Sequence, residues 1–250
     1  MTDETIRNLS DILRASKRLV VFTGAGISVP SGIPDFRSPG GLYMQKEFDG
    51  ASPEEIISHT YFLKNTARFY RFYREKMLYP DAEPNDAHRF LAALETDDRR
   101  VTVVTQNIDG LHEAAGSTHV IPLHGTVHRN FCVKCGRQFD LAGLLAHLDA
   151  DGIPRCPTDG AIIKPDVVLY EEPLDEAVVS DALDAIADAD TMLIIGTSLV
   201  VYPAASYIRY FGGEHLLLIN KSETPYDRMA EIAVYDDVVN VVKRLDGIWL

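Results

Sequence analysis

The hydrophobic positions of the chain follow two kinds of pattern that alternate along its length. Short apolar runs rich in branched residues predict buried strands, at 19–22, 101–105, 119–123, 191–195 and 215–219. Apolar residues at helical spacing predict amphipathic helices, at 4–16, 85–95 and 174–188. This alternation predicts an α/β fold, in which helices cover both faces of a parallel sheet.

The segment between the first two predicted strands departs from this alternation. Residues 38–50 are polar and rich in glycine, which predicts a long functional loop. Residues 52–55, Ser-Pro-Glu-Glu, have the capping serine, proline and acids of a helix start. Residues 60–79 predict one long helix that stops before Pro80, with its many aromatic side chains mostly in the core.

A glycine turn follows the first predicted strand. The run 19–22 leads into Thr-Gly-Ala-Gly at 23–26, where glycines allow a backbone to approach a ligand closely. Backbone N–H groups at such a turn, before a helix start, form an anion site suited to a phosphate. Val29 stands where the dinucleotide fingerprint has its third glycine, so an ordinary strand-to-helix turn is the alternative.

The loop after this turn, Ser-Gly-Ile-Pro-Asp-Phe-Arg at 31–37, has an order of residues that hydrophobic burial does not require. Phe36 could cover a cofactor ring, and the planar fork of Arg37 could meet a phosphate or ribose oxygen. The alternative is a plain loop in which Phe36 fills the core and Arg37 is solvated.

Polar residues also follow later strands, where ligands bind in parallel sheets. Residues 106–109, Gln-Asn-Ile-Asp, suit ribose hydroxyls and a carboxamide, although Asn107 or Asp109 could instead cap a helix. His124 follows another strand and titrates near neutral pH, but a structural histidine is the alternative. The small residues of 196–198, Gly-Thr-Ser, suit phosphate contacts.

The three cysteines belong to a second unit that begins near residue 127. Cys132 and Cys135 form a C-x-x-C pair, and twenty residues separate Cys135 from Cys156. This spacing favours a structural zinc site, with Asp159 where a fourth cysteine is expected. Because zinc is borderline soft, a Cys3Asp site should bind it less tightly than four thiolates. A degenerate ribbon without metal is the alternative.

Composition narrows the class of protein. The 250 residues are 46% hydrophobic and 24% charged, as in ordinary globular proteins, and the net charge is −13. The charge argues against general nucleic-acid binding and would favour a cationic partner such as a lysine-rich peptide. No apolar run approaches the ~18–20 residues that cross a bilayer, and the polar first residues do not resemble a signal peptide. We therefore expect a cytoplasmic protein with no membrane partner.

Several motifs in register resemble the sirtuin family of NAD-dependent protein deacylases. They are GAGISVPSGIPDFR from Gly24, TQNIDGLH from Thr105 and His-Gly at 124–125. The resemblance extends over nearly the whole chain. We expect a Rossmann-like part made of 1–35, 84–126 and 162–250. A smaller part would combine a helical insert with the cofactor loop at 36–83 and a zinc ribbon at 127–161.

The resemblance implies NAD as cofactor, with His124 as general base and with Asn107 and Asp109 at the nicotinamide pocket. The cofactor-binding residues that we expect are Gly24, Ala25, Gly26, Val29, Phe36, Arg37, Gln106, Asn107, Ile108, Asp109, His124, Gly196, Thr197, Ser198, Asn220, Asp237 and Val238. An acetyl-lysine peptide would add as a strand along 162–172, with Val168 and Tyr170 lining the acyl-lysine tunnel. Glu171 replaces a glycine of the family pattern Val-Val-x-Phe-Gly-Glu, which puts the peptide's path there in doubt.

The implied activity is transfer of acetyl from lysine to ADP-ribose, releasing nicotinamide and O-acetyl-ADP-ribose. Family members that remove acidic acyl groups carry Tyr-x-x-Arg in the helix where this chain has Tyr70 and Tyr73. We therefore expect uncharged acyl groups, because nothing in the sequence shows that Arg71 or Arg74 substitutes. The alternatives are an NAD-dependent protein ADP-ribosyltransferase and a non-catalytic NAD-sensing module, although mere binding does not require a base beside the ribose.

Overall fold

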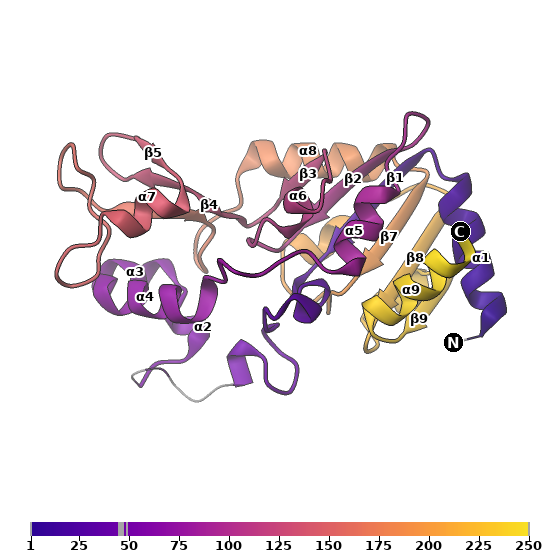
Figure 1. The fold of residues 1–250 in the computed structure, drawn as a ribbon, viewed down its shortest axis with the longest axis horizontal. Coiled ribbons are helices and arrows are strands. Elements are labelled where there is room, and N and C mark those ends of the chain that lie inside the picture. The colour runs from indigo at the N-terminus through magenta and orange to yellow at the C-terminus, as the bar shows by residue number, and fades with distance from the viewer. Residues whose placement is uncertain (1, 45–47, 49, 250) are drawn as a thin grey trace.

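A six-stranded parallel sheet forms the larger part of the molecule (Figure 1). The structure, a computed structural model, describes residues 2–44, 48 and 50–249. The strands lie in the order β3-β2-β1-β7-β8-β9. Their bounds are β1 Arg18–Thr23, β2 Arg100–Thr105, β3 Val120–Pro122, β7 Thr191–Ile195, β8 His215–Asn220 and β9 Ile232–Tyr235. Strand order reverses between β1 and β7, where such sheets hold ligands.

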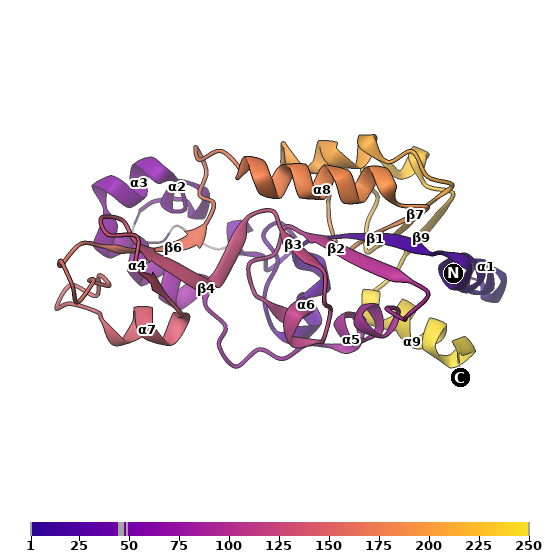
Figure 2. The ribbon, with the colours of Figure 1, turned by 90° about the horizontal axis from the view of Figure 1, so that it is seen from above.

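Both faces of this sheet are covered, as the apolar pattern predicts (Figure 2). On one face, side chains of α1 (Asp3–Ala15), α5 (Asp86–Ala93) and α9 (Val238–Trp249) pack with Leu19 and Val21 of β1. On the other face, α8 (Glu176–Asp188) and the 3-10 helix Ala204–Tyr210 pack with Val20 and Phe22. Successive residues of β1 therefore point to opposite cores, which explains why the strand is continuously apolar. The predicted fold class is confirmed.

A second, antiparallel sheet lies in the smaller part, in the order β5-β4-β6. Its strands are β4 Gly125–Cys132, β5 Gln138–Phe139 and β6 Ile163–Val167, and α7 (Leu141–Ala146) packs beside it. Residues 163–167, assigned from the sequence to the larger part, pair with β4 in this sheet. The exact bounds of the two parts stay a prediction.

The predicted helix at 60–79 is wrong as one continuous element. The chain forms α2 (Pro53–Ile56), α3 (His59–Lys64), α4 (Thr66–Phe72) and a π-helix at Tyr73–Met77. Asn65 interrupts the helix because its φ of −133° and ψ of 43° lie outside the helical region. The expected core role of the aromatic residues is confirmed, since Phe69, Tyr70 and Tyr73 are fully buried.

Short 3-10 helices lie at two other points where the sequence predicts a helix start and a loop. The glycine turn leads into two 3-10 helices, Ala25–Ile27 and Val29–Ser31, rather than into an α-helix. The predicted loop 38–50 contains the 3-10 helix Leu42–Met44, and its residues 45–47 and 49 lie outside the described residues. Among the described helices, none combines the length and apolar character that crossing a membrane requires.

Candidate active site and metal centre

A cavity of about 1430 Å³ lies beside the carboxyl ends of β1, β2, β7 and β8, and the smaller part contributes to its wall. This exceeds the ~300–1,000 Å³ usual for one small ligand, so the cavity has room for a large ligand or for two ligands. Its walls are contributed by the glycine turn, residues 33–43, the ends of β2, β7 and β8, and the segment 167–174.

The glycine turn contacts the end of β7. The amide of Gly26 donates to the carbonyl of Gly196 at 2.8 Å, and a Cβ on Gly26 would lie 2.7 Å from that oxygen. A Cβ on Gly24 would lie 2.8 Å from Cβ of Thr197. Glycine is therefore required because two turns approach each other, a reason that the sequence analysis did not identify.

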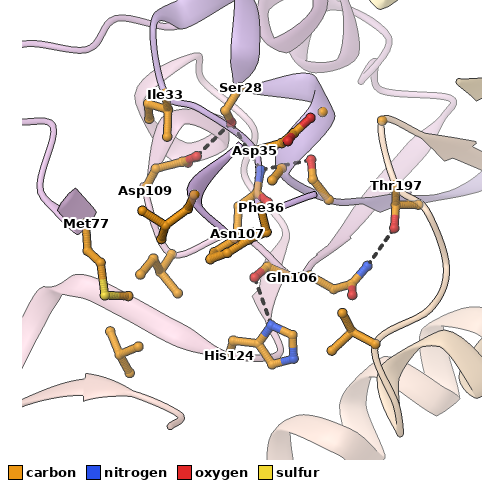
Figure 3. A pocket seen from close by; sticks show the side chains of 18 of the residues that line it. Ser28, Ile33, Asp35, Phe36, Met77, Gln106, Asn107, Asp109, His124 and Thr197 are labelled. Carbon is orange, nitrogen blue, oxygen red and sulfur yellow. Dashed lines mark hydrogen bonds between the residues drawn. The ribbon is translucent and has the colours of Figure 1, made fainter. Parts of the chain in front are cut away.

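Three polar side chains form a connected network at the end of β2 (Figure 3). The side-chain amide Nδ2 of Asn107 donates to the Ser28 hydroxyl at 3.1 Å and to the Gly24 carbonyl at 3.2 Å. The Ser28 hydroxyl donates to Asp109 at 2.7 Å. The other carboxylate oxygen of Asp109 accepts from the amide of Leu111, the first residue of α6 (Leu111–Ala114), at 3.0 Å. The N-cap of this helix is Gly110, so Asp109 contacts the start of the helix without being its cap.

His124 lies on the cavity wall with its ring orientation fixed (Figure 3). Its Nδ1 lies 2.9 Å from the carbonyl oxygen of Gln106, which can only accept a hydrogen bond. Nδ1 therefore carries the hydrogen, and in the neutral ring the lone pair is on Nε2. Burial lowers the pKa of His124 more than the Gln106 bond raises it, so the ring is neutral at neutral pH.

The loop 33–44 is held in a compact shape beside the cavity. Leu42 and Tyr43 donate their amides to the carbonyls of Asp35 and Phe36, at 2.7 and 2.8 Å. The Asp35 carboxylate accepts from the amide of Arg37 at 3.1 Å. Phe36 and Arg37 therefore both reach the cavity wall from an ordered loop.

Nearly all the site residues that the sequence suggested line this one cavity. Those on its wall are Gly24, Ala25, Gly26, Val29, Phe36, Arg37, Gln106, Asn107, Ile108, Asp109, His124, Val168, Tyr170, Gly196, Thr197, Ser198, Asn220 and Val238. Asp237 is not among the described residues of the wall, and its carboxylate pairs with Lys221 at 2.9 Å. The roles of these wall residues in binding and catalysis stay predictions.

Three further wall residues went unnoticed in the sequence. Ser28 lies in the quoted glycine motif, yet its link between Asn107 and Asp109 depends on contacts 79 and 81 residues apart. Tyr43 and Met77 also line the cavity. The position of Ser28 one turn after the glycines could have indicated a role in the site, whereas nothing in the local sequence indicates one for Tyr43 or Met77.

The segment after β6 is fastened to His124 and to the helical insert. The amide of Val168 donates to the His124 carbonyl at 3.0 Å, and that of Tyr170 donates to the Ile57 carbonyl at 3.0 Å. Glu171 has a φ of +76°, a conformation that favours glycine, and its carboxylate accepts from the amide of Thr60 at 2.8 Å. This bond helps to hold a strained residue at the position of the family glycine.

The aromatic segment places none of its arginines on the cavity wall, although Lys76 of its π-helix does line the cavity. Tyr70 is fully buried and donates to the carbonyl of Ile163 at 2.6 Å. The Arg74 guanidinium donates to the Gly152 carbonyl, and Arg71 lies over the Phe48 ring at 5.1 Å. Neither arginine is among the described residues of the cavity wall.

The four predicted metal ligands form one cluster. One ligand atom from each of Cys132, Cys135, Cys156 and Asp159 lies within 4.8 Å of the others. The Cys135 and Cys156 sulfurs are 3.8 Å apart, and Cys132 Sγ lies 3.4 Å from Asp159 Oδ1. Tetrahedral zinc with Zn–S bonds of ~2.3 Å places sulfurs about 3.8 Å apart, so the cluster fits zinc. Backbone amides of Lys134 and Cys135 point at Cys132 Sγ, as suits a thiolate.

The doubly covered parallel sheet and the polar groups at its switch point define an α/β nucleotide-binding protein with a small metal-binding part. The chain belongs to the Sir2 family, whose model matches residues 24–203, and the predicted family is thereby confirmed. An NAD-dependent protein deacetylase of Clostridium acetobutylicum is 49% identical, with 97% of this chain and 98% of the relative covered. One of Staphylococcus epidermidis is 43% identical, with 98% of each chain covered.

Solved structures agree with these relatives. One named "Sir2-p53 peptide-NAD+" superposes with a TM-score of 0.86 at 36% identity, covering 98% of both chains. Another Sir2 structure, whose name includes deacetylated p53 peptide and 3'-O-acetyl ADP ribose, has a TM-score of 0.85 at 35% identity. That match covers 97% of this chain and 98% of the other.

Proposed function

We propose that the protein is an NAD-dependent protein-lysine deacetylase, which transfers acetyl from lysine to ADP-ribose and releases nicotinamide and O-acetyl-ADP-ribose. The observation that carries the proposal is His124. Its Nδ1–H is held by the Gln106 carbonyl on the wall of a cavity shared with the glycine turn and the end of β2. The relatives and their complexes with peptide and NAD support the same activity.

His124 acts as the general base. Because the Gln106 carbonyl holds the hydrogen on Nδ1, Nε2 accepts a proton from a hydroxyl group brought into the cavity. The carbonyl of His124 accepts from Val168, so the segment assigned to the peptide and the base are joined by one hydrogen bond. This connection supports the close positioning of base and acyl-lysine that the reaction requires.

Asn107, Ser28 and Asp109 form the polar wall of the nicotinamide pocket. Their mutual bonds fix the Asn107 amide and the Asp109 carboxylate in place before any ligand arrives, which reduces the reorganisation on binding. Phe36 covers the ring, and the residues of the glycine turn and of 196–198 hold the phosphates. When bound, NAD supplies the ADP-ribosyl group that accepts the acetyl group.

The peptide lies along 168–170 as an added strand, with Val168 and Tyr170 at the acyl-lysine. The acyl group is uncharged, because the tyrosine and arginine that would bind an acidic acyl group are not available here: Tyr70 is buried, and Arg74 donates to the Gly152 carbonyl. Zinc bound by Cys132, Cys135, Cys156 and Asp159 is structural, since four protein ligands leave no open position. The reduced cysteines that it needs favour a cytoplasmic location.

The test replaces His124 by alanine. We expect His124→Ala to lower deacetylation of an acetyl-lysine peptide by roughly 10²–10⁴-fold while NAD still binds, because a general base contributes that much. His119→Ala is the matched control, because that histidine pairs with Glu95 outside the cavity wall. Full turnover by His124→Ala would remove the residue from its role.

Mass spectrometry of the peptide separates this function from its alternatives. Incubation with NAD should yield deacetylated peptide and released nicotinamide. A peptide that carries ADP-ribose would identify an ADP-ribosyltransferase instead. An unchanged peptide, with NAD bound, would identify a sensing module.

A further inference from the structure

Two phenol hydroxyls meet at the cavity wall, and they connect segments that are far apart in the sequence. Oη of Tyr43 and Oη of Tyr170 lie 2.8 Å apart, across 127 residues of chain. Both residues line the cavity. Burial raises the pKa of Tyr43, and the hydrogen bond to Tyr170 raises it further, so the hydroxyl stays protonated.

Tyr43 is rigidly attached to the loop assigned to the cofactor. Its amide donates to the Phe36 carbonyl at 2.8 Å, and the two rings lie 5.1 Å apart. The Arg37 guanidinium lies 5.1 Å from the centroid of the Tyr43 ring. A displacement of the Tyr43 side chain would therefore disturb both Phe36 and Arg37.

Tyr170 is attached to the segment assigned to the acyl-lysine peptide. Its amide donates to Ile57, and its carbonyl accepts from the amide of His59, both at 3.0 Å. Two residues earlier, Val168 donates to the carbonyl of His124. Tyr170 is 39% exposed. Its main chain is held by these hydrogen bonds, and its side-chain hydroxyl is held by Tyr43.

We propose that the hydrogen bond between Tyr43 and Tyr170 couples the binding of acyl-lysine peptide to the binding of NAD, with both tyrosines acting as positioning residues. The inference rests on the proposed function. A peptide that packs on the exposed part of the Tyr170 ring restrains its hydroxyl, which holds Tyr43 and with it Phe36 and Arg37 over the cofactor. By linkage, NAD must tighten peptide binding by the same factor.

The experiment measures NAD affinity with and without an acetyl-lysine peptide. Calorimetry uses an NAD analogue whose glycosidic bond cannot break, so that no turnover occurs. We expect the peptide to tighten binding about fivefold in the native protein, the effect of one neutral hydrogen bond. Tyr170→Phe and Tyr43→Phe should each reduce this factor to about one, and the double variant should reduce it no further.

Tyr235→Phe is the matched control, because it removes a tyrosine hydroxyl that donates to Asp227, and neither residue is among the described residues of the cavity wall. It should keep the native factor. Hydrogen exchange of the Leu42 and Tyr43 amides, measured without NAD, should rise in Tyr170→Phe and in Tyr43→Phe, which lose the same bond, and should stay unchanged in the control. An unchanged factor in Tyr170→Phe, or losses that add in the double variant, would overturn the coupling. Failure of the native protein to bind the analogue even with peptide would overturn the proposed function as well.

Discussion

His124 has a chemical state set by two opposing influences of its neighbours. Burial disfavours the charged ring and lowers its pKa, whereas the bond from Nδ1 to the Gln106 carbonyl favours it. Burial is the larger effect, so the pKa lies below its ordinary value near 6.5. The residue type was visible in the sequence, but the tautomer and the pKa depend on Gln106, which lies 18 residues away.

The lowered pKa predicts how activity depends on pH. A general base works only when it is neutral, so kcat/KM should exceed half of its maximum at pH 6.5 and reach its midpoint at a more acidic pH. A profile of kcat/KM for an acetyl-lysine peptide between pH 5 and 8 measures this, at saturating NAD. An acid limb with its midpoint at or above 6.5 would contradict the assignment of burial as the dominant influence.

At the scale of elements, the junction between His124 and β4 depends on one glycine. Gly125 has a φ of +76°, and a Cβ there would lie 1.9 Å from the carbonyl oxygen of Asp166 in β6. The close approach of β4 to β6 therefore requires glycine immediately after the base. The His-Gly pair is visible in the sequence, whereas the position of Gly125 against β6 is visible only in the structure.

Gly125→Ala should therefore destabilise the protein strongly. We expect the free energy of unfolding to fall by about 3 kcal/mol or more, because both the backbone conformation and a clash with the backbone oppose the added methyl group. Denaturant unfolding of the variant gives the value. Gly116→Ala is the control, because Gly116 has a φ of +104° with nothing within 4 Å of an added Cβ. Gly116→Ala should lower the free energy of unfolding by less. Equal decreases in the two variants would show that the clash with Asp166 does not destabilise the protein.

At the scale of the whole molecule, two sheets of different kind share one cavity. The parallel sheet has cores on both faces, whereas the part of the antiparallel sheet around β5 and α7 packs on a small core that includes Cys132 and Cys156. Small units with little apolar core often depend on a metal. The stability of the part around β4, β5 and α7 should therefore depend on zinc more than that of the larger sheet does.

Metal removal tests this dependence. Treatment with a strong chelator should lower the temperature at which the smaller part unfolds, relative to the zinc-loaded protein. Circular dichroism measures the unfolding, and metal analysis measures the zinc content. Asp159→Cys should bind zinc at least about tenfold more tightly, because thiolate suits the ion better than a carboxylate. Asp159→Ala should lose it. Equal zinc affinity of all three proteins would show that residue 159 is not a ligand.

The sequence by itself determined the strands and the main helices, because alternating burial leaves a local pattern of apolar residues. It also revealed the family, through motifs such as 24–37 and 105–112. It failed at 60–79, where propensity favours helix throughout but the backbone of Asn65 breaks it.

Only the tertiary structure decided which groups meet. Gly26 bonds to Gly196, Ser28 joins Asn107 to Asp109, and Tyr43 reaches Tyr170, all across more than 75 residues. It also placed β6 beside β4 in the smaller sheet. These contacts arise from strand pairing and packing between distant segments, which leave no periodic trace along the chain. The residue types were therefore readable in advance, whereas their distances, orientations and protonation states were not.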